Sequence, residues 1–407
     1  MAIPTAKSIA TSKKQAQLVI APAGSGKTRI LVDTIAYRIK HKLVDLDEVD
    51  VIVFTFTNNA ADELTDCSLR DVPFSSSMPA YDVVMRPKAR AIVEKYYPGV
   101  LSKVPAWILS ESMPSFSTLI TLDQLLARMD INDDANAAAM REELAALPVT
   151  REDKVSRCAR FDAEPVNFDL GDEPVQVLIY QKINGYDHGE SVTAATENLS
   201  KLAKEMGYGV SVSAKGSAFT TENLAEFDVV IWNNVSGDTL TLSQRRAFED
   251  YMNNGGGFLG IHASAGDSVY FWDWYRDVLI GAQFIGHPGD DNWFQDASLD
   301  VTHHDTGVAD GIPARWELND EWYSFSESVS TKGYDIVMAI DESTYVPGKK
   351  LEMGEDHPLV WTHCIGDGRA MYSAIGHRKE VYQAEYNITL LKNGMRWTAG
   401  QGKDTCK

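Results

Sequence analysis

From Val175 onward, short apolar segments alternate with amphipathic ones, and this alternation constrains the fold more than any other feature of the chain. Buried strands are indicated at residues 175–180, 209–214, 228–234 and 257–262. Single helical stretches separate them, at residues 191–207, 220–227 and 241–255. Strands joined in this way form a parallel sheet with helices on both faces. We therefore predict an α/β domain with a doubly wound parallel sheet.

Polar segments follow three of these predicted strands. They are residues 184–188, 233–238 and 262–266. In doubly wound sheets ligands bind beyond the carboxyl ends of the strands. We expect the three segments to form one rim, with Tyr186, His188 and Asn234 as candidate substrate-binding residues.

The end of the domain has its own pattern. Apolar runs on both sides of Gly366 and Gly368 predict a β-hairpin, and a final helix is expected through Trp397. His377 directly follows the hairpin, where it can face the rim.

Ordered segments spread over this domain resemble one family. They include NGYDH at residues 184–188, GGGFLGIHA at 255–263, DEWY at 320–323 and GRAMYSAIGH at 368–377. Over about residues 175–400 the chain is similar to the ThuA-like family, which is named for trehalose utilisation. The resemblance implies a class I glutamine amidotransferase-like, flavodoxin-like fold and a role in carbohydrate metabolism.

The turn after the fourth predicted strand differs from that of the amidotransferases. In those enzymes a cysteine occupies this elbow and attacks an amide, whereas here the residue is His262. Glutaminase activity is therefore not expected. The spacing of His262 and Ser264 also does not fit the G-x-S-x-G nucleophile pattern.

An imidazole at the elbow suits acid or base catalysis and also metal binding. The candidate catalytic residues lie at loop or strand ends and are His262, His287, Asp320, Glu321 and His377. The candidate ligands of a divalent transition metal such as zinc, manganese or iron are His188, His262 and His287. The alternative is that these histidines only hydrogen-bond to the backbone and shape loops.

Aromatic residues near these positions suit a sugar ring, because flat apolar faces stack on its carbon–hydrogen side. The candidates are Trp272, Trp274, Trp322 and Tyr323. Packing in the core is the alternative for each of them. We expect a small sugar ligand and, if the domain is an enzyme, acid/base chemistry of the hydrolase, lyase or isomerase type. A non-catalytic ligand-binding module remains open.

The beginning of the chain belongs to another class. A short strand at residues 17–20, a glycine-rich loop at 21–28 and a helical stretch form a P-loop pattern. Gly24, Gly26, Lys27 and Thr28 are its candidate ligands for ATP and magnesium. AGSGKT at 23–28 and FTNNAADEL at 56–64 resemble the start of UvrD-type superfamily 1 DNA helicases. The later acidic strand and arginines are not found, so helicase activity is not expected. ATP binding and a non-binding remnant stay open.

Four parts follow from these patterns: a P-loop fragment at 1–65, a helical module at 66–148, a linker at 149–174 and the ThuA-like domain at 175–400. Helices in the module are indicated at 81–97, 119–129 and 135–148. If the chain is a genuine gene fusion, residues 1–148 should pack on the rest of the chain. If the two parts were joined by an error of sequence assembly, the front part should be detached and poorly ordered.

Composition limits partners and location. Residues 151–407 hold 22 Lys and Arg against 40 Asp and Glu, within a formal net charge of −20. Nucleic acid is therefore not an expected partner. Charged residues interrupt the apolar runs before the ~18 residues of a membrane helix, and no export signal is evident. The four cysteines, which form no CxxC pair, predict neither a zinc ribbon nor a dense disulfide scaffold. We expect a cytoplasmic protein; the oligomeric state stays open.

Overall fold

The structure is a computed structural model that describes residues 74–132, 135–150, 164–302 and 306–402, together with residues 153, 162 and 406. The chain forms two compact units, Met1–Cys67 and Ser68–Lys407, and the described residues all belong to the second. The P-loop segment with Gly24, Gly26, Lys27 and Thr28 lies outside the described residues, as do residues 151–152, 154–161 and 163 of the predicted linker.

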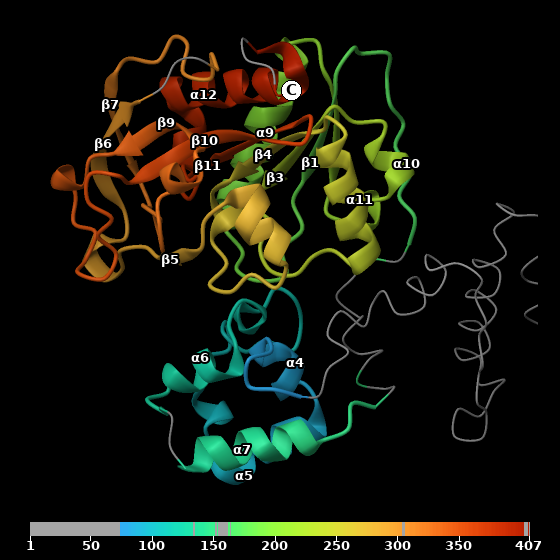
Figure 1. The fold of residues 1–407 in the computed structure, drawn as a ribbon, viewed down its shortest axis with the longest axis vertical. Coiled ribbons are helices and arrows are strands. Elements are labelled where there is room, and N and C mark those ends of the chain that lie inside the picture. The colour runs from blue at the N-terminus through green and yellow to red at the C-terminus, as the bar shows by residue number, and fades with distance from the viewer. Residues whose placement is uncertain are drawn as a thin grey trace, which may run out of the picture. The chain divides into compact units, whose positions relative to one another are not determined.

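A nine-stranded mixed sheet forms the centre of the larger domain (Figure 1). In spatial order its strands are β2 (Gly209–Ser213), β1 (Gln176–Tyr180), β3 (Val229–Asn233), β4 (Gly257–Ile261), β11 (Gly368–Ser373), β10 (Pro358–Ile365), β9 (Asp335–Ile340), β6 (Gln295–Val301) and β7 (Arg315–Asp320). The first five strands pair in parallel and the remaining four in antiparallel fashion. The predicted strands and the terminal hairpin are confirmed, and the antiparallel half extends the predicted parallel sheet.

Helices cover both faces of the sheet. They are α9 (Glu190–Glu205), α10 (Thr221–Leu224), α11 (Leu242–Asn253) and α12 (Glu385–Arg396). Helices α9 and α12 contact each other, and so do α10 and α11. In β4 the side chain of Phe258 packs on Phe248 of α11, whereas Leu259 points toward α12. Since adjacent strand residues face opposite layers, β4 is apolar throughout.

Short elements complete the domain near the carboxyl ends of the parallel strands. A 3₁₀ turn, His262–Ala265, follows β4, and a π-helical turn spans Tyr275–Ile280. Strands β5 (Phe284–Gly286) and β8 (Ser324–Phe325) form a separate two-stranded sheet. At the opposite, amino end of β4, a second π-helical turn, Trp397–Gln401, continues α12.

The helical module has its own apolar core. Its helices are α4 (Ala80–Val84), α5 (Pro87–Tyr96), α6 (Leu122–Ala127) and α7 (Ala135–Ala146). The predicted first helix is broken in two because Pro87 lacks the N–H that a continuous helix needs, and it instead begins α5. Thr121 and Gln124 cap the start of α6 reciprocally.

This module contacts the loop that follows β1. The Ser115 N–H donates to the carbonyl oxygen of Asn184 at 3.0 Å, and the Thr118 hydroxyl donates to the same oxygen at 3.1 Å. A Cβ atom at Gly185 would lie 2.4 Å from the Leu119 side chain, so this close packing requires glycine. The described part of the module therefore packs on the larger domain, whereas residues 1–73, which the fusion prediction also covers, lie outside the described residues.

Two further features bear on location. Cys364 at the end of β10 forms a disulfide with Cys406, which the spacing of the cysteines did not predict. Since disulfides are rare in cytosolic proteins, this bridge argues against the expected cytoplasmic location. Among the described residues, no helix combines the length and apolar character needed to cross a membrane.

Candidate functional site

His262 stands at a sharp turn at the carboxyl end of β4. Its backbone φ angle is 43°, in the left-handed region that few residues other than glycine adopt, and its side chain is fully buried. Gly376 approaches it so closely that a Cβ atom there would lie 2.9 Å from the Cβ of His262. Backbone strain of this kind is often found at functional sites.

The ring of His262 is held in one orientation. Its Nδ1 lies 2.7 Å from the carbonyl oxygen of Ala374, to which it donates. The ring stacks on Tyr323 with 4.2 Å between centroids. Because Nδ1 carries the proton, the Nε2 lone pair points toward the other polar side chains of the site, as in histidines that bind metals.

The adjacent carboxylates after β7 take different roles. Asp320 is fully buried and accepts the backbone N–H groups of Gly376 and Arg378 at 2.7 and 2.9 Å. Glu321 points the other way, and its Oε2 lies 3.4 Å from His262 Nε2 and 3.1 Å from His377 Nδ1. Asp320 therefore positions the segment that carries His377, and only Glu321 reaches the site.

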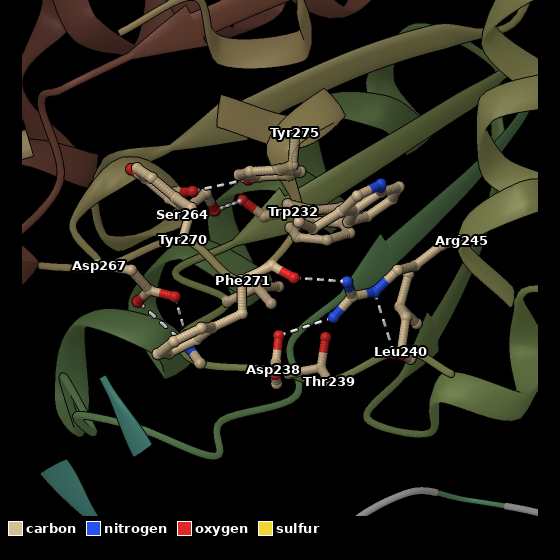
Figure 2. Close-up of a pocket in the computed structure, with 13 residues that line it drawn as sticks. Trp232, Asp238, Thr239, Leu240, Arg245, Ser264, Asp267, Tyr270, Phe271 and Tyr275 are labelled. Carbon is tan, nitrogen blue, oxygen red and sulfur yellow. Dashed lines mark hydrogen bonds and ion pairs between the residues drawn. The ribbon is translucent and has the colours of Figure 1, made fainter. Parts of the chain in front are cut away.

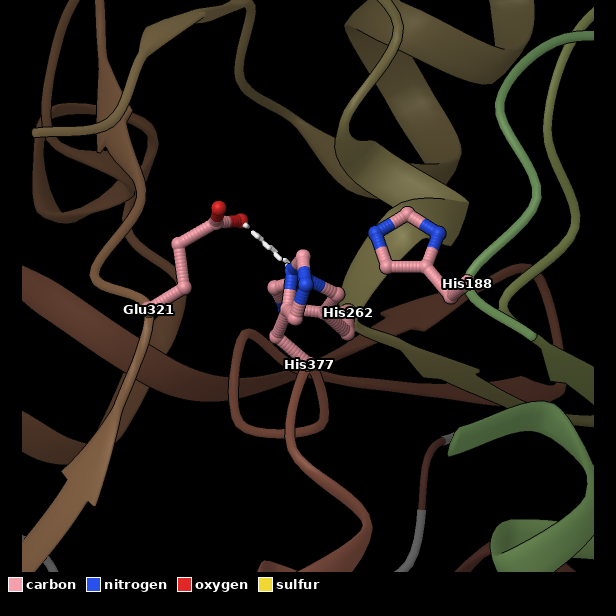
Figure 3. A group of neighbouring side chains, drawn as sticks. All are labelled: His188, His262, Glu321 and His377. Atoms are coloured by element: carbon pink, nitrogen blue, oxygen red, sulfur yellow. Dashed lines mark hydrogen bonds and ion pairs between the residues drawn. The ribbon is translucent and has the colours of Figure 1, made fainter. Parts of the chain in front are cut away.

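His188 completes a compact group (Figure 3). Potential ligand atoms of His188, His262, Glu321 and His377 all lie within 4.8 Å of one another. The three histidines of the group follow different strands: His188 follows β1, His262 follows β4 and His377 follows β11. Among the described residues, the buried Nδ1 of His188 has no hydrogen-bond partner. An orphaned buried nitrogen beside three other ligands suggests a bound group.

The protonation states suit a cation. Burial acts to raise the pKa of Glu321, but the neighbouring imidazoles of His262 and His377 outweigh it, so this pKa lies well below the usual range of glutamate. Burial lowers the pKa of His188 well below that of a free imidazole. The site therefore offers an ionised carboxylate and a neutral imidazole at neutral pH, which are the forms that bind metals.

His287 and Trp293 contact the other oxygen of Glu321. His287 Nδ1 lies 3.2 Å from Glu321 Oε1, and the Trp293 indole N–H donates to the same oxygen. His287, predicted as a metal ligand, thus lies beside the cluster, and Glu321 and His377 join His188 and His262 in the group of candidate ligands.

A cavity of about 310 Å³ opens over this group, which is the size of a small-ligand site. Its wall includes His188, His287, Glu321 and His377, while His262 lies behind the wall. Tyr186 and Tyr323, both predicted to bind substrate, line it together with Phe284 and Trp293, so the wall combines aromatic and polar groups.

Four other predicted substrate-binding residues do not line this cavity. Asn234 is fully buried, and its backbone φ angle is 52°. Its amide donates to the Asn233 side chain and to the Tyr382 hydroxyl, so it stabilises the loop after β3 and does not contact the cavity. Trp322 is also fully buried and donates to the carbonyl oxygen of Gln295. Both predictions of ligand contact are therefore corrected.

Trp272 and Trp274 are corrected in the same way. They stack on each other with 5.4 Å between centroids, and both rings contact Phe248 of α11. Trp272 also borders a smaller cavity of about 30 Å³, whose other lining residues are shown in Figure 2. Core packing, the alternative considered for the tryptophans, accounts for this pair.

Figure 2 shows two buried carboxylates beside that small cavity. Asp238 forms an ion pair of 2.7 Å with Arg245, and Asp267 accepts the Gly237 N–H. Burial raises the pKa of Asp267 to about 7. The small cavity has about a tenth of the volume of the cavity over the His/Glu group and no room for a sugar, so these groups stabilise the rim loops.

Comparison with known proteins agrees with this arrangement. The family model of ThuA, described as trehalose utilisation, matches residues 176–398, more than half of the chain. The chain belongs to the ThuA family. The predicted fold is thereby confirmed, and the family's description supports the predicted role related to carbohydrate metabolism.

A solved structure of a ThuA-like protein has the same fold. A putative ThuA-like protein from Bacteroides uniformis is 27% identical, with a TM-score of 0.50, over 59% of this chain and 97% of that one. One from Parabacteroides merdae is 16% identical, with a TM-score of 0.44, over 57% and 93%. No curated protein matches the chain.

The front of the chain matches a second family model. The UvrD/REP helicase N-terminal domain matches residues 4–160. The resemblance found in the sequence was limited to the first 65 residues, and this match extends it over the helical module.

Several site residues were not singled out in the sequence. Trp293 and Phe294 lie in a polar stretch between β5 and β6, and Phe294 packs on His377 with 5.0 Å between centroids. Trp107, Phe116 and Arg128 of the helical module also line the cavity. The Trp-Phe pair stands alone in a polar stretch of the sequence, and this could have marked it as a candidate for the site. Local sequence patterns do not show that residues of the helical module line the same cavity.

Proposed function

We propose that the ThuA domain binds one divalent transition metal ion through His188, His262, Glu321 and His377 and acts on a sugar derivative above it. One observation carries the proposal: the ligand atoms of these four side chains lie within 4.8 Å of one another beneath a cavity of about 310 Å³. Three imidazole nitrogens and one carboxylate oxygen suit zinc, manganese or iron.

The neighbouring groups supply orientation and proton transfer. Ala374 fixes the tautomer of His262 through its carbonyl oxygen, and Asp320 holds the backbone next to His377. His287 lines the cavity and contacts Glu321, so it is the group placed to exchange a proton with a bound substrate. When bound, the metal would polarise a substrate oxygen.

The wall of the cavity favours a sugar over a purely apolar ligand. Tyr186, Phe284 and Tyr323 present aromatic surfaces, and Trp293 adds a half-exposed ring beside Glu321. Aromatic faces bind the apolar side of a sugar while nearby polar groups bind its hydroxyls. The family's description, trehalose utilisation, points to the same class of substrate.

A thermal-shift experiment tests this function. The full-length protein, loaded with zinc or manganese, is mixed with trehalose, glucose or a keto-sugar, and we expect at least one of them to raise the melting temperature. His262→Ala should abolish the shift, whereas His363→Gln, at a histidine that bonds to Val278 away from the site, should retain it. If no sugar changes the melting temperature of the metal-loaded protein, the sugar part of this proposal is wrong, and the domain is a non-catalytic ligand-binding domain.

A second candidate function concerns the front of the chain. The match of residues 4–160 to the UvrD/REP helicase N-terminal domain favours ATP binding by Lys27 and Thr28. ATP with magnesium should then raise the melting temperature of the protein, and Lys27→Ala should remove that effect without changing the response to sugars.

A further inference from the structure

Residues of the helical module form one side of the cavity that contains the His/Glu group. They are Trp107, Phe116, Leu119 and Arg128. All four precede the matched ThuA region, which begins at residue 176. This wall is thus added to the family's domain by another part of the chain, within the same compact unit.

The contacts between the module and the domain hold this wall in place. Two hydrogen bonds join Ser115 and Thr118 to Asn184, four residues before His188. Tyr186 packs against the module's apolar core and also against the ring of His188, with 4.9 Å between centroids. Tyr186 therefore connects the module directly to a candidate ligand.

The wall contributed by the module combines an exposed indole, a second aromatic ring and a guanidinium group. The Trp107 side chain is 57% exposed, and its ring meets Phe116 edge to face at 5.4 Å. The guanidinium of Arg128 lies 5.3 Å from the Phe116 ring centroid. The exposed indole at the cavity thus offers a flat aromatic face of the kind that stacks on a sugar ring.

We propose that Trp107, Phe116 and Arg128 form a second sugar subsite, so that the protein binds a ligand with two linked sugar rings. One ring lies over His188, Glu321 and His377, and the second stacks on the Trp107 indole. Arg128, an exposed cation for which the described residues show no carboxylate partner, donates to the hydroxyls of the second ring. This inference rests on the proposed function, since it assigns the first ring to the same cavity.

The lining of the cavity supports this division. One cavity of about 310 Å³ is lined both by His188, Glu321 and His377 and by Trp107, Phe116 and Arg128. A ligand that contacts both groups of side chains therefore spans the cavity, as two linked rings would.

The test measures the affinity of the metal-loaded full-length protein for trehalose, which has two rings, and glucose, which has one, by titration calorimetry. We expect Trp107→Ala to weaken trehalose binding about tenfold and to leave glucose binding within about twofold. Arg128→Gln should act in the same direction with a smaller loss. Trp293→Ala is the matched control, because its ring contacts Glu321 and its loss should weaken both sugars.

The outcomes separate the two proposals. Equal effects of Trp107→Ala on both sugars, or no effect on either, would overturn the second subsite while the proposed function stands. If the unaltered protein binds metal but neither sugar, the sugar part of the proposed function fails, and the subsite fails with it. Metal content, measured for each variant, excludes loss of the first site as the cause.

Discussion

The backbone N–H of Gly376 donates to the buried carboxylate of Asp320 at 2.7 Å. This bond ties the end of β7, which continues into Glu321, to the segment that follows β11 and carries His377. Two candidate ligands from distant parts of the sequence are thereby brought together by a residue that does not reach the cavity.

Replacing Asp320 should loosen this junction. Asp320→Asn leaves one oxygen to accept two N–H groups and directs an NH₂ toward a backbone donor, so we expect a loss of about 1–3 kcal/mol in the free energy of unfolding. Metal affinity should fall by roughly 10- to 100-fold, as for other residues that orient ligands. Urea unfolding and zinc titration measure both. Asp335→Asn, on an exposed part of β9, is the control and should change neither.

The buried carboxyl of Asp267 should make stability depend on pH. Its folded pKa of about 7 lies above the unfolded value, so the folded state holds a proton that the unfolded state releases between about pH 4 and 7. The free energy of unfolding contributed by this group therefore falls as pH rises through that range, by about 3–4 kcal/mol in all.

Asp267→Asn tests that dependence, because an amide cannot ionise. The variant should unfold at similar urea concentrations at pH 5 and pH 8, and at pH 8 it should be more stable than the unaltered protein. A variant with the same pH slope as the unaltered protein would show that Asp267 does not retain its proton in the folded state.

Metal binding should add stability that chelation removes. Ligand binding to the folded state alone, at a metal concentration about 100 times the dissociation constant, contributes about 2.7 kcal/mol. We expect EDTA to lower the melting temperature of the unaltered protein and to have no effect on His188→Ala. The difference should vanish below about pH 5, where protons compete for the imidazoles.

The bond between Cys364 and Cys406 should stabilise the end of the domain. It closes a segment with a sequence separation of 42, for which the loss of chain entropy in the unfolded state amounts to about 4 kcal/mol. Reductant should therefore lower the melting temperature, and Cys406→Ser should lower it equally and lose the response. Thiol titration of protein whose free thiols are alkylated at the moment of lysis reports whether the bridge forms in the cell.

Much of the fold was predictable because burial on both faces leaves a clear signature. The apolar run of β4 and its glycine-rich approach indicated a central strand, and the Gly366–Gly368 turn indicated the hairpin of β10 and β11. The antiparallel strands β6, β7 and β9 were harder, because they are partly exposed and their sequences mix polar and apolar residues.

The sequence predicted that histidines and carboxylates form the site, but it did not predict which of the candidate residues lie together. His188, His262 and His377 follow strand ends, where the topology of the sheet brings them together. The separate roles of Asp320 and Glu321 follow from the alternation of side chains along an extended chain, yet which of the two faces the cavity depends on strand register. Trp272 and Trp274 are partly buried against Phe248 of α11, a contact between distant residues that local sequence does not reveal.

Elemental analysis of the purified full-length protein after dialysis against metal-free buffer tests the central claim most directly. We predict about one equivalent of a transition metal per chain, retained by His363→Gln and lost from the double variant Glu321→Gln, His377→Ala. Absence of metal from the unaltered protein even after incubation with zinc, manganese or iron, or full retention by the double variant, would contradict a metal centre at the His/Glu group.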